Sequence, residues 1–459
     1  MLRQNPQADR PDPARRRLLA YVPALGLGLA GCRGGEDHPA RKAGTAASPP
    51  PPSAPSAVVE DTGRPIPPSS EPSIRVRVDR VDDGRIEFGP ASSLFWVTAP
   101  GHEYRAAHRG PFRVVRTSNG WRLTSVVAGR PAAIALPKAE SLTLTAMNGQ
   151  ASPAYRGASL PGVVHLVPSG KADSLRVDVV CHLPIESYLP GVLAGELFTS
   201  WRPATHEALA VAARSFALCE RYHWLSRRDF DVVADERSQV WRGGTAPSRC
   251  REAVSNTRGE LLLFRDRVVP GYYSAACGGR PASAIDAISS NPVNGIQPLS
   301  VSASDQRAAC PCRGFGPHGS WRTTFEPGDV VEAIRSRAAS WGASKSMSSV
   351  WPPRIEVLDR TTSGRPARFR VTTFDRTSSA EIDAIELQRA LNGLSKGRPV
   401  RSADFRPFVE RSRLSVSGSG FGHGVGLCQY GSESLARGGA PASQILARYY
   451  PGTTVRRHW

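Results

Sequence analysis

The stretch from Leu183 to Leu197 reads LPIESYLPGVLAGEL, and it marks a change in the hydrophobic periodicity of the chain. Before it, short segments alternate apolar and polar residues, as half-buried strands do. From this stretch onward, small and apolar residues recur at helical spacing. We therefore expect one helix over Leu183–Leu197 and a second over Pro203–Leu225, and the boundary between a β-rich and a helical part at about residue 181.

The segments from about residue 74 to 180 that alternate apolar and polar residues are separated by Gly, Pro and Asn. This pattern predicts mostly antiparallel β structure. Downstream, helical patterns recur over residues 328–339, 381–391 and 440–450. The fold class is therefore predicted to be α+β. We expect residues 74–459 to form one elaborated domain, β-rich at about 74–180, with a helical and C-terminal part at about 181–459 and a Gly-rich C-terminal loop.

The N-terminal residues have the pattern of an export signal. Three arginines, Arg15 to Arg17, precede an apolar run from Leu18 to Gly31 that is too short to cross a bilayer and ends at Cys32. Leu29-Ala30-Gly31-Cys32 resembles a bacterial lipobox, so we expect residues 1–31 to be a lipoprotein signal peptide and Cys32 to be lipidated. An ordinary signal with an incidental cysteine is the alternative. Residues 32–73 are rich in Pro and Ser and are predicted to be a tether.

The composition is strongly basic. The 459 residues carry a formal net charge of +19, and nearly all basic residues are arginine. Such a chain suits a polyanionic partner, namely nucleic acid, an anionic membrane surface or an acidic wall polymer. The alternative is a biased codon usage spread over a solvated surface. Charge alone therefore assigns no function.

Glu196 is the first candidate for chemistry. It lies among Ala194, Gly195, Leu197 and Phe198, and burial in such a setting raises the pKa of a carboxyl group, as a general acid at neutral pH requires. A glutamate that reaches solvent from a helix end is the simpler alternative. Arg214 interrupts an apolar helical run, so it either pairs with a buried carboxylate or reaches a ligand.

The Gly-rich stretch from Gly418 to Gly431 is the second candidate. Six glycines in fourteen residues imply turns with positive φ and close approach of the backbone to other groups. It matches neither a dinucleotide-binding nor a phosphate-binding loop. His423, Gln429 and Tyr430 on such a loop would form a flat polar surface suited to sugars, whereas a structural turn with a satisfied histidine is the alternative.

Cysteines provide the third candidate. Cys277, Cys310 and Cys312 could supply three thiolates to zinc, with His318 or water as the fourth ligand. Because an exported protein meets oxidising conditions, a disulfide from Cys277 to Cys310 or Cys312 is the rival interpretation. The other cysteines of the presumed folded part show no ligand spacing and are expected to be buried or paired: Cys181, Cys219, Cys250 and Cys428.

Taken together, these segments resemble the stage II sporulation protein D family, also called the SpoIID/LytB domain. The resemblance covers most of the chain from about residue 74 to 459. It rests on ordered blocks that are listed here by residue number: 183–189, 195–196, 201, 208–217, 238–241, 257–259, 274–280, 422–431 and 449–453.

The resemblance implies a peptidoglycan lytic transglycosylase that cleaves MurNAc–GlcNAc bonds of peptide-stripped glycan strands and leaves 1,6-anhydro-MurNAc ends. Glu196 takes the position of the family's catalytic glutamate and would serve as acid and then as base. The residues that the resemblance or the loop chemistry places on the glycan are Arg214, Gln239, Ser274, His423, Gln429 and Tyr430. A non-catalytic peptidoglycan-binding module that enhances a cell-wall amidase is the alternative.

Two departures from the family pattern concern the metal. Ser274 stands where members commonly have a histidine, and Cys428 stands where they have a serine. Zinc-binding members use that histidine with cysteines, so we expect no required cofactor and a structural zinc only as a possibility at Cys277, Cys310 and Cys312. The expected partners are glycan strands, a membrane through the lipid anchor and an amidase, without nucleic acid. The expected location is the cell envelope, on its periplasmic or extracytoplasmic face.

Overall fold

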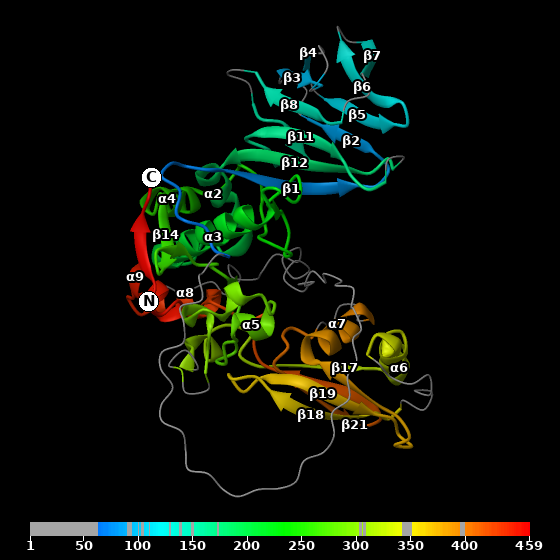
Figure 1. The fold of residues 1–459 in the computed structure, drawn as a ribbon, viewed down its shortest axis with the longest axis vertical. Coiled ribbons are helices and arrows are strands. Elements are labelled where there is room, and N and C mark those ends of the chain that lie inside the picture. Colours follow the sequence, from blue (N-terminus) through cyan, green and yellow to red (C-terminus); the bar gives the residue numbers. More distant parts are fainter. Residues whose placement is uncertain are drawn as a thin grey trace, which may run out of the picture.

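The computed structural model describes residues 63–89, 94–99, 101, 105–109, 111–127, 130–136, 140–147, 151–171, 174–302, 305, 309–341, 351–394 and 400–459. The predicted signal peptide and Cys32 lie outside these residues. Figure 1 shows a β-rich N-terminal part, a largely helical part beside it, and a second α/β part beyond the helices. The structure is mixed and β-rich, consistent with the predicted α+β class.

The N-terminal part consists of two large sheets and a two-stranded sheet of β9 and β10. A seven-stranded sheet has the order β13-β1-β12-β11-β8-β3-β4, and a four-stranded sheet has the order β2-β5-β6-β7. Burial alternates along β2 and β3, as the sequence pattern predicts, whereas β12 is buried along most of its length. The strands are β1 Ser73–Val81, β2 Arg85–Phe88, β3 Leu94–Thr98, β4 Arg105–Arg109, β5 Phe112–Thr117, β6 Gly120–Val127, β7 Arg130–Leu136, β8 Leu142–Ala146, β9 Ala154–Tyr155, β10 Ala158–Ser159, β11 Val163–Pro168, β12 Val177–Pro184 and β13 Val232–Val233.

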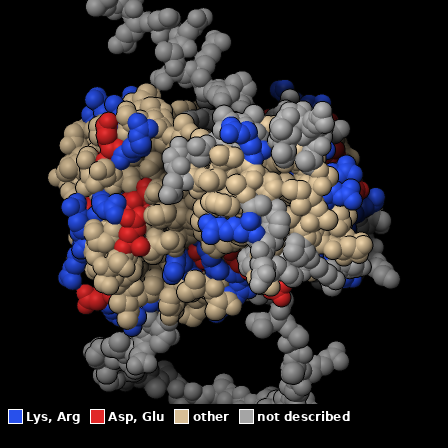
Figure 2. Space-filling view, turned by 90° about the horizontal axis from the view of Figure 1, so that it is seen from above, with Lys and Arg blue, Asp and Glu red and all other residues tan. Residues whose placement is uncertain are grey.

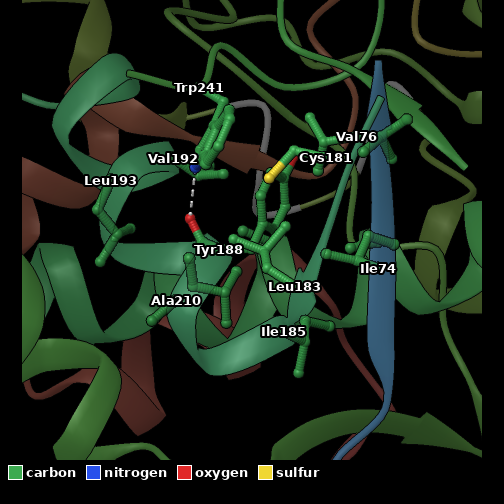
Figure 3. Close-up of a cluster of buried hydrophobic side chains, with 14 of the residues drawn as sticks. Ile74, Val76, Cys181, Leu183, Ile185, Tyr188, Val192, Leu193, Ala210 and Trp241 are labelled. Atoms are coloured by element: carbon green, nitrogen blue, oxygen red, sulfur yellow. Dashed lines mark hydrogen bonds between the residues drawn. The ribbon is translucent and has the colours of Figure 1, made fainter. Parts of the chain in front are cut away.

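The helical part packs on the edge of the large sheet, where β12 runs directly into the first helix. Pro184 breaks the strand and leads into α2, which then presents an apolar face to β1 and β12. In Figure 3, Tyr188 and Trp241 lie in this core, and the Trp241 indole N–H donates to the Tyr188 carbonyl at 3.1 Å. The elements are α2 Ile185–Glu196, α3 Pro203–Trp224, α4 Ser248–Asn256, β14 Glu260–Phe264, β15 Arg267–Val268, β16 Tyr273–Ser274, α5 Ala284–Ala287, η1 Pro292–Gly295, η2 Gln297–Leu299, η4 Pro311–Arg313, β23 Leu427–Cys428, α8 Gln429–Arg437, α9 Ala442–Tyr449 and β24 Thr454–Arg457.

Residues 321–418, which we call the inserted lobe, have a hydrophobic cluster of their own. Phe369, Phe405 and Leu414 are among its buried members. The sequence predicts one elaborated domain, and this separate cluster is a feature that the periodicity does not reveal. The lobe consists of β17 Trp321–Phe325, α6 Pro327–Arg335, η5 Ala338–Trp341, β18 Arg354–Arg360, β19 Pro366–Thr372, β20 Ser379–Asp383, α7 Ala384–Leu394, β21 Phe405–Glu410 and β22 Arg413–Gly418.

The end of the predicted tether is folded, which corrects its boundary. Arg64 is fully buried and its guanidinium donates to the Phe264 carbonyl at 3.0 Å. The Pro72 carbonyl accepts from the Ile185 amide at the start of α2. Proline and serine content suggested a chain without contacts, whereas backbone hydrogen bonds and one buried arginine fix these residues on the helical part.

Two predicted boundaries also need correction, namely the start of the helix at residues 381–391 and the end of the Gly-rich loop. Residues 381–383 belong to strand β20, so α7 begins only at Ala384. Alternate burial in β20 shows why, since Ala380 and Ile382 point into the lobe's core. The Gly-rich stretch ends in helix α8, which begins at Gln429. In the part of the chain that the structure describes, no helix is long and apolar enough to cross a membrane.

The basic residues do not merge into one surface on the face drawn in Figure 2. Lysine and arginine form small groups separated by neutral and acidic side chains. Many arginines are paired with carboxylates, for example Arg176 with Asp82 and Arg370 with Glu381. On this face the arrangement fits the interpretation of a solvated, charge-mixed surface.

Candidate functional site

Glu196 is the last residue of α2, and the helix brings it against the segment that follows β13. A Cβ atom on Gly195 would lie 2.3 Å from the Val240 carbonyl oxygen, so only glycine allows this close approach. In return the Val240 amide donates to Glu196 Oε1 at 2.9 Å. The local sequence of α2 thus places the carboxyl group on a backbone donor.

Two further segments complete the surroundings of this carboxyl group. The Tyr273 hydroxyl donates to Glu196 Oε1 at 3.4 Å, and Gln429 Nε2 donates to Oε2 at 3.0 Å. Parallel pairing of β16 with β23 places Tyr273 opposite Leu427, and so brings the two donors together. Both carboxyl oxygens are therefore held by donors from three segments that are far apart in the sequence.

The electrostatic setting favours a proton on Glu196. Burial raises the pKa of this carboxyl group above its ordinary value, while the bonds from Val240, Gln429 and Tyr273 and the charge of Arg242 act in the opposite direction. Glu196 as a whole residue nevertheless keeps part of its surface exposed. A carboxylic acid with a raised pKa on a partly exposed residue is suited to donate a proton to a bound substrate.

Arg214 does not contact this site, and its predicted contact with glycan needs correction. Its side chain is 0% exposed and forms an ion pair with Glu186 at 2.8 Å. It also donates to the Glu260 carbonyl at 3.1 Å. The pairing alternative is therefore the one that the structure has, because a side chain with no exposed surface cannot touch a polymer.

Gln239 lies next to the site but below its surface. The side chain is 1% exposed, accepts from the Tyr188 hydroxyl at 3.1 Å and donates to the Ala213 carbonyl at 3.3 Å. Its backbone neighbour Val240 makes the contact with Glu196. Gln239 thus packs beneath the carboxyl group, a position in which it supports the segment rather than reaching a ligand.

The remaining predicted contacts differ in how accessible they are. Ser274 is buried, and its hydroxyl has no hydrogen-bond partner among the described residues. His423 Nδ1 accepts from the Val425 amide at 3.0 Å, and burial lowers its pKa to about 4, so the ring is neutral near pH 7. Tyr430 is half-buried, edge-on to Trp201 and to His318. Tyr430 and His423 thus keep part of their surface exposed, whereas Ser274 does not.

The four cysteines Cys277, Cys310, Cys312 and Cys428, which we call the cysteine cluster, form a buried group whose sulfur atoms all lie within 4.8 Å of one another. The Sγ atoms of Cys277 and Cys312 are 3.5 Å apart, and all four side chains are free thiols rather than disulfides. Zinc–sulfur bonds of 2.3 Å in a tetrahedron separate the sulfurs by about 3.8 Å, so the donor set fits such a site.

The membership of this cluster corrects two predictions. Cys428 was expected to be unrelated because it shows no ligand spacing, yet the β16–β23 pairing places it beside Cys277. His318 was one of two candidates for the fourth ligand, with water as the other, but it is not a member of the group and its Nδ1 faces Arg401 Nη1 at 3.2 Å. Cys181, Cys219 and Cys250 lie elsewhere.

The cysteine cluster shares two chain segments with the carboxyl site. Cys428 precedes Gln429 in the chain, and Cys277 follows Tyr273 by four residues. Two of the three segments that donate to Glu196 thus also contribute cysteines to the cluster. Tyr273 and the Val240 amide were not anticipated from the sequence, since a backbone donor carries no residue-type signal.

The site is a carboxylic acid at the end of a helix, held by donors that include Gln429 of the Gly-rich segment. Comparison with known proteins indicates the class of protein to which such a site belongs. Residues 173–264 match the family model described as stage II sporulation protein, which includes Glu196 and Arg214. Over these residues the chain matches the stage II sporulation protein family, and relatives named stage II sporulation protein D are similar to it over a longer stretch.

Several curated proteins are similar over about three fifths of the chain. An uncharacterized protein of Brachyspira hyodysenteriae is 27% identical over 60% of this chain and 68% of its own length. The amidase enhancer of Bacillus subtilis is 25% identical over 58% of this chain, but this covers only 40% of that relative. Stage II sporulation protein D of Bacillus subtilis is 23% identical over 60% of this chain and 75% of its own length.

Proposed function

We propose that this protein is a peptidoglycan lytic transglycosylase that uses Glu196 to cleave the MurNAc–GlcNAc bond of glycan strands. The observation that carries the proposal is a carboxyl group with a raised pKa, on a partly exposed residue and held by Tyr273, Gln429 and the Val240 amide. The amidase enhancer and stage II sporulation protein D among the relatives support a role at the cell wall.

The geometry suits a reaction with one carboxyl group. Protonated Glu196 gives its proton to the glycosidic oxygen, and the bond from that oxygen to the MurNAc C1 breaks. The MurNAc O6 then bonds to C1 and returns its proton to Glu196, so that no water is consumed and a 1,6-anhydro ring results. Among the described residues, no second carboxylate is hydrogen-bonded to Glu196, so the arrangement differs from a paired-carboxylate glycosidase.

The donors around Glu196 serve both halves of this cycle. They fix the orientation of the carboxyl group, so that its proton is directed toward the glycosidic oxygen of the bound strand. Hydrogen bonds from Tyr273 and Gln429 also stabilise the carboxylate that is formed after the first proton transfer. Half-buried Tyr430, next in the chain to Gln429, offers a ring against which a pyranose can pack.

Peptide-stripped strands are the proposed substrate, and the envelope is the proposed location. Export would place the enzyme beside this polymer, and lipidation of Cys32 would hold it at a membrane surface.

Incubating the purified protein with denuded and with peptide-bearing strands, followed by mass spectrometry for 1,6-anhydro ends, tests the activity. Anhydro ends from the denuded strands are expected; their absence would contradict the proposal.

A non-catalytic role has one specific observation in its favour, namely the similarity to an amidase enhancer. In that case the protein would co-sediment with glycan, would form no anhydro ends, and would stimulate a cell-wall amidase. Replacing Glu196 by glutamine would leave such stimulation unchanged. The same incubation with an amidase added therefore distinguishes the two functions.

The pH dependence of cleavage should report on Glu196. Since the acid must be protonated, the rate is expected to fall as the pH rises through its raised pKa, above the ordinary value of 4.5. Gln429→Met removes a donor that favours the carboxylate, so it should move this limb to higher pH. Rates measured from pH 4 to 9 check this; an unmoved limb would contradict the role of Gln429.

The cysteine cluster is the proposed site of a structural zinc ion. A divalent ion bound to four thiolates carries a net charge of −2, and Arg365 lies close enough to Cys277 and Cys312 for its positive charge to offset part of it. The ion would tie together the segments that carry Tyr273 and Gln429. It takes no part in bond cleavage.

Metal analysis should find about one zinc ion per chain in protein that was purified without chelators. Cobalt in its place should give the intense absorption of a tetrahedral thiolate site. Cys428→Ser should reduce the metal content several-fold, whereas Cys181→Ala, at a buried cysteine outside the cluster, should not. Metal-free protein in which these four cysteines form two disulfides would contradict the proposal.

A further inference from the structure

Arg365 reaches from the inserted lobe into the main body of the protein. It lies in the turn between β18 and β19, and its side chain is buried, with the whole residue 4% exposed. Its guanidinium donates to three main-chain carbonyls: Nε to Arg280 at 2.7 Å, Nη1 to His423 at 3.0 Å and Nη2 to Cys277 at 3.0 Å. No carboxylate of the described residues forms an ion pair with it.

These three carbonyls belong to two of the three segments that donate to Glu196. Cys277 and Arg280 continue the segment that begins with Tyr273, and His423 precedes the one that carries Gln429. The segments are joined to each other by bonds such as Phe421 N–H to the Ala276 carbonyl at 2.7 Å. A planar fork of donors that spans both segments fixes their separation and their relative angle.

The backbone around the guanidinium is shaped to admit it. A Cβ atom on Gly424 would lie 2.2 Å from Arg365 Nη2, and Gly424 has φ +77°, a conformation that favours glycine. Arg280 reaches in the opposite direction and pairs with Asp404 of the lobe at 3.2 Å. The contact is therefore built from both sides rather than being incidental packing.

We propose that Arg365 is a positioning residue through which the inserted lobe holds Tyr273 and Gln429 against Glu196. Its role in cleavage rests on the proposed function, whereas its effect on the two segments does not. Without the guanidinium, the Arg280 and His423 carbonyls lose this donor, and the Cys277 carbonyl keeps, among the described donors, only the Arg280 amide at 3.2 Å, so the bonds that place Tyr273 and Gln429 weaken. Glu196 then loses hydrogen bonds that favour its ionised form.

Amide hydrogen exchange tests the structural half of the proposal in the full-length protein. Arg365→Met should speed exchange at Ala282, Phe421 and Val425 by about ten-fold or more, while the amides of β14 stay as in the unaltered chain. Arg365→Lys keeps the charge but not the fork, so it should restore little of this protection. Arg360→Met, at an exposed arginine on the same hairpin, is the matched control and should change nothing.

The pH profile of cleavage tests the second half. Because the donors to Glu196 are weakened, Arg365→Met should move the alkaline limb to higher pH as well as lower the rate. Uniform acceleration of exchange, β14 included, would overturn the proposal, since that result describes general destabilisation. Unchanged exchange at Ala282, Phe421 and Val425, or full restoration by lysine, would also overturn it. If the unaltered protein cleaves no glycan, the lytic function fails while the exchange result still decides the role of Arg365.

Discussion

Glu196→Gln is expected to reduce the release of anhydro ends from denuded glycan by at least about a thousand-fold. General acid–base catalysis contributes about 10² to 10⁴ in rate, and here a single group supplies the acid and then the base. The glutamine oxygen can still accept from the Val240 amide, so the geometry of the site is retained. The amide can neither give up a proton to the glycosidic oxygen nor take one from O6. Mass spectrometry of the soluble products measures the loss.

The stability of the same variant shows whether the fold survives. A carboxyl group with a raised pKa binds its proton more tightly in the folded state, so stability falls as the pH rises through that pKa. Glutamine carries no charge and avoids this cost, so Glu196→Gln should be at least as stable as the original chain at pH 7, with a difference that shrinks on acidification. Glu252→Gln, a substitution at an exposed residue of α4, should leave both activity and stability unchanged. Normal cleavage by Glu196→Gln would refute the mechanism.

Arg214→Met should lower the free energy of unfolding by about 3–5 kcal/mol, the usual cost of removing one partner of a buried ion pair. The Glu186 carboxylate would remain buried beside the Gly259 amide and the Trp459 indole N–H, which donate to it at 3.1 and 3.0 Å. These donors cannot replace the bidentate guanidinium. Denaturant unfolding followed by circular dichroism measures the change.

An exposed ion pair provides the comparison for this variant. Arg354 and Glu356 are both about half exposed, so Arg354→Met should cost less than about 1 kcal/mol. Replacing Arg214 and Glu186 together by apolar residues should recover part of the loss, because no charge is then left buried. If Arg214→Met were as stable as the original chain and only bound glycan less tightly, this result would contradict the structural role and indicate that Arg214 contacts the glycan.

The predictions that rested on periodicity were the most accurate. The apolar spacing around α2 and α3 located both helices to within two residues, because burial of one face imposes the same pattern on any amphipathic helix. The corresponding pattern failed at β20, where residues 381–383 alternate over too short a distance to be distinguished from a helix start. The separate cluster of the inserted lobe was missed because local spacing does not indicate which core an apolar residue joins.

The site was predicted unevenly for a related reason. Glu196 came from the family resemblance, whereas Arg214, Gln239 and Gln429 were placed on glycan although all three are buried. The contact of Tyr273 with Glu196 depends on the parallel pairing of β16 with β23. The membership of Cys428 in the cysteine cluster depends on the same pairing. That pairing joins residues distant in sequence, and each of these strands contributes only two residues, so no periodic pattern announces it.

The inserted lobe begins and ends at one place on the main body. Trp321 at the start of β17 and Gly418 at the end of β22 are opposite each other in the same antiparallel pairing. A segment whose two ends already meet adds almost no closure entropy to the rest of the chain, whatever its length. Residues of this lobe that do not touch the main body can therefore be added, lost or exchanged without altering the path of the segments beside Glu196, whereas a change at Arg365 or Asp404 would reach those segments.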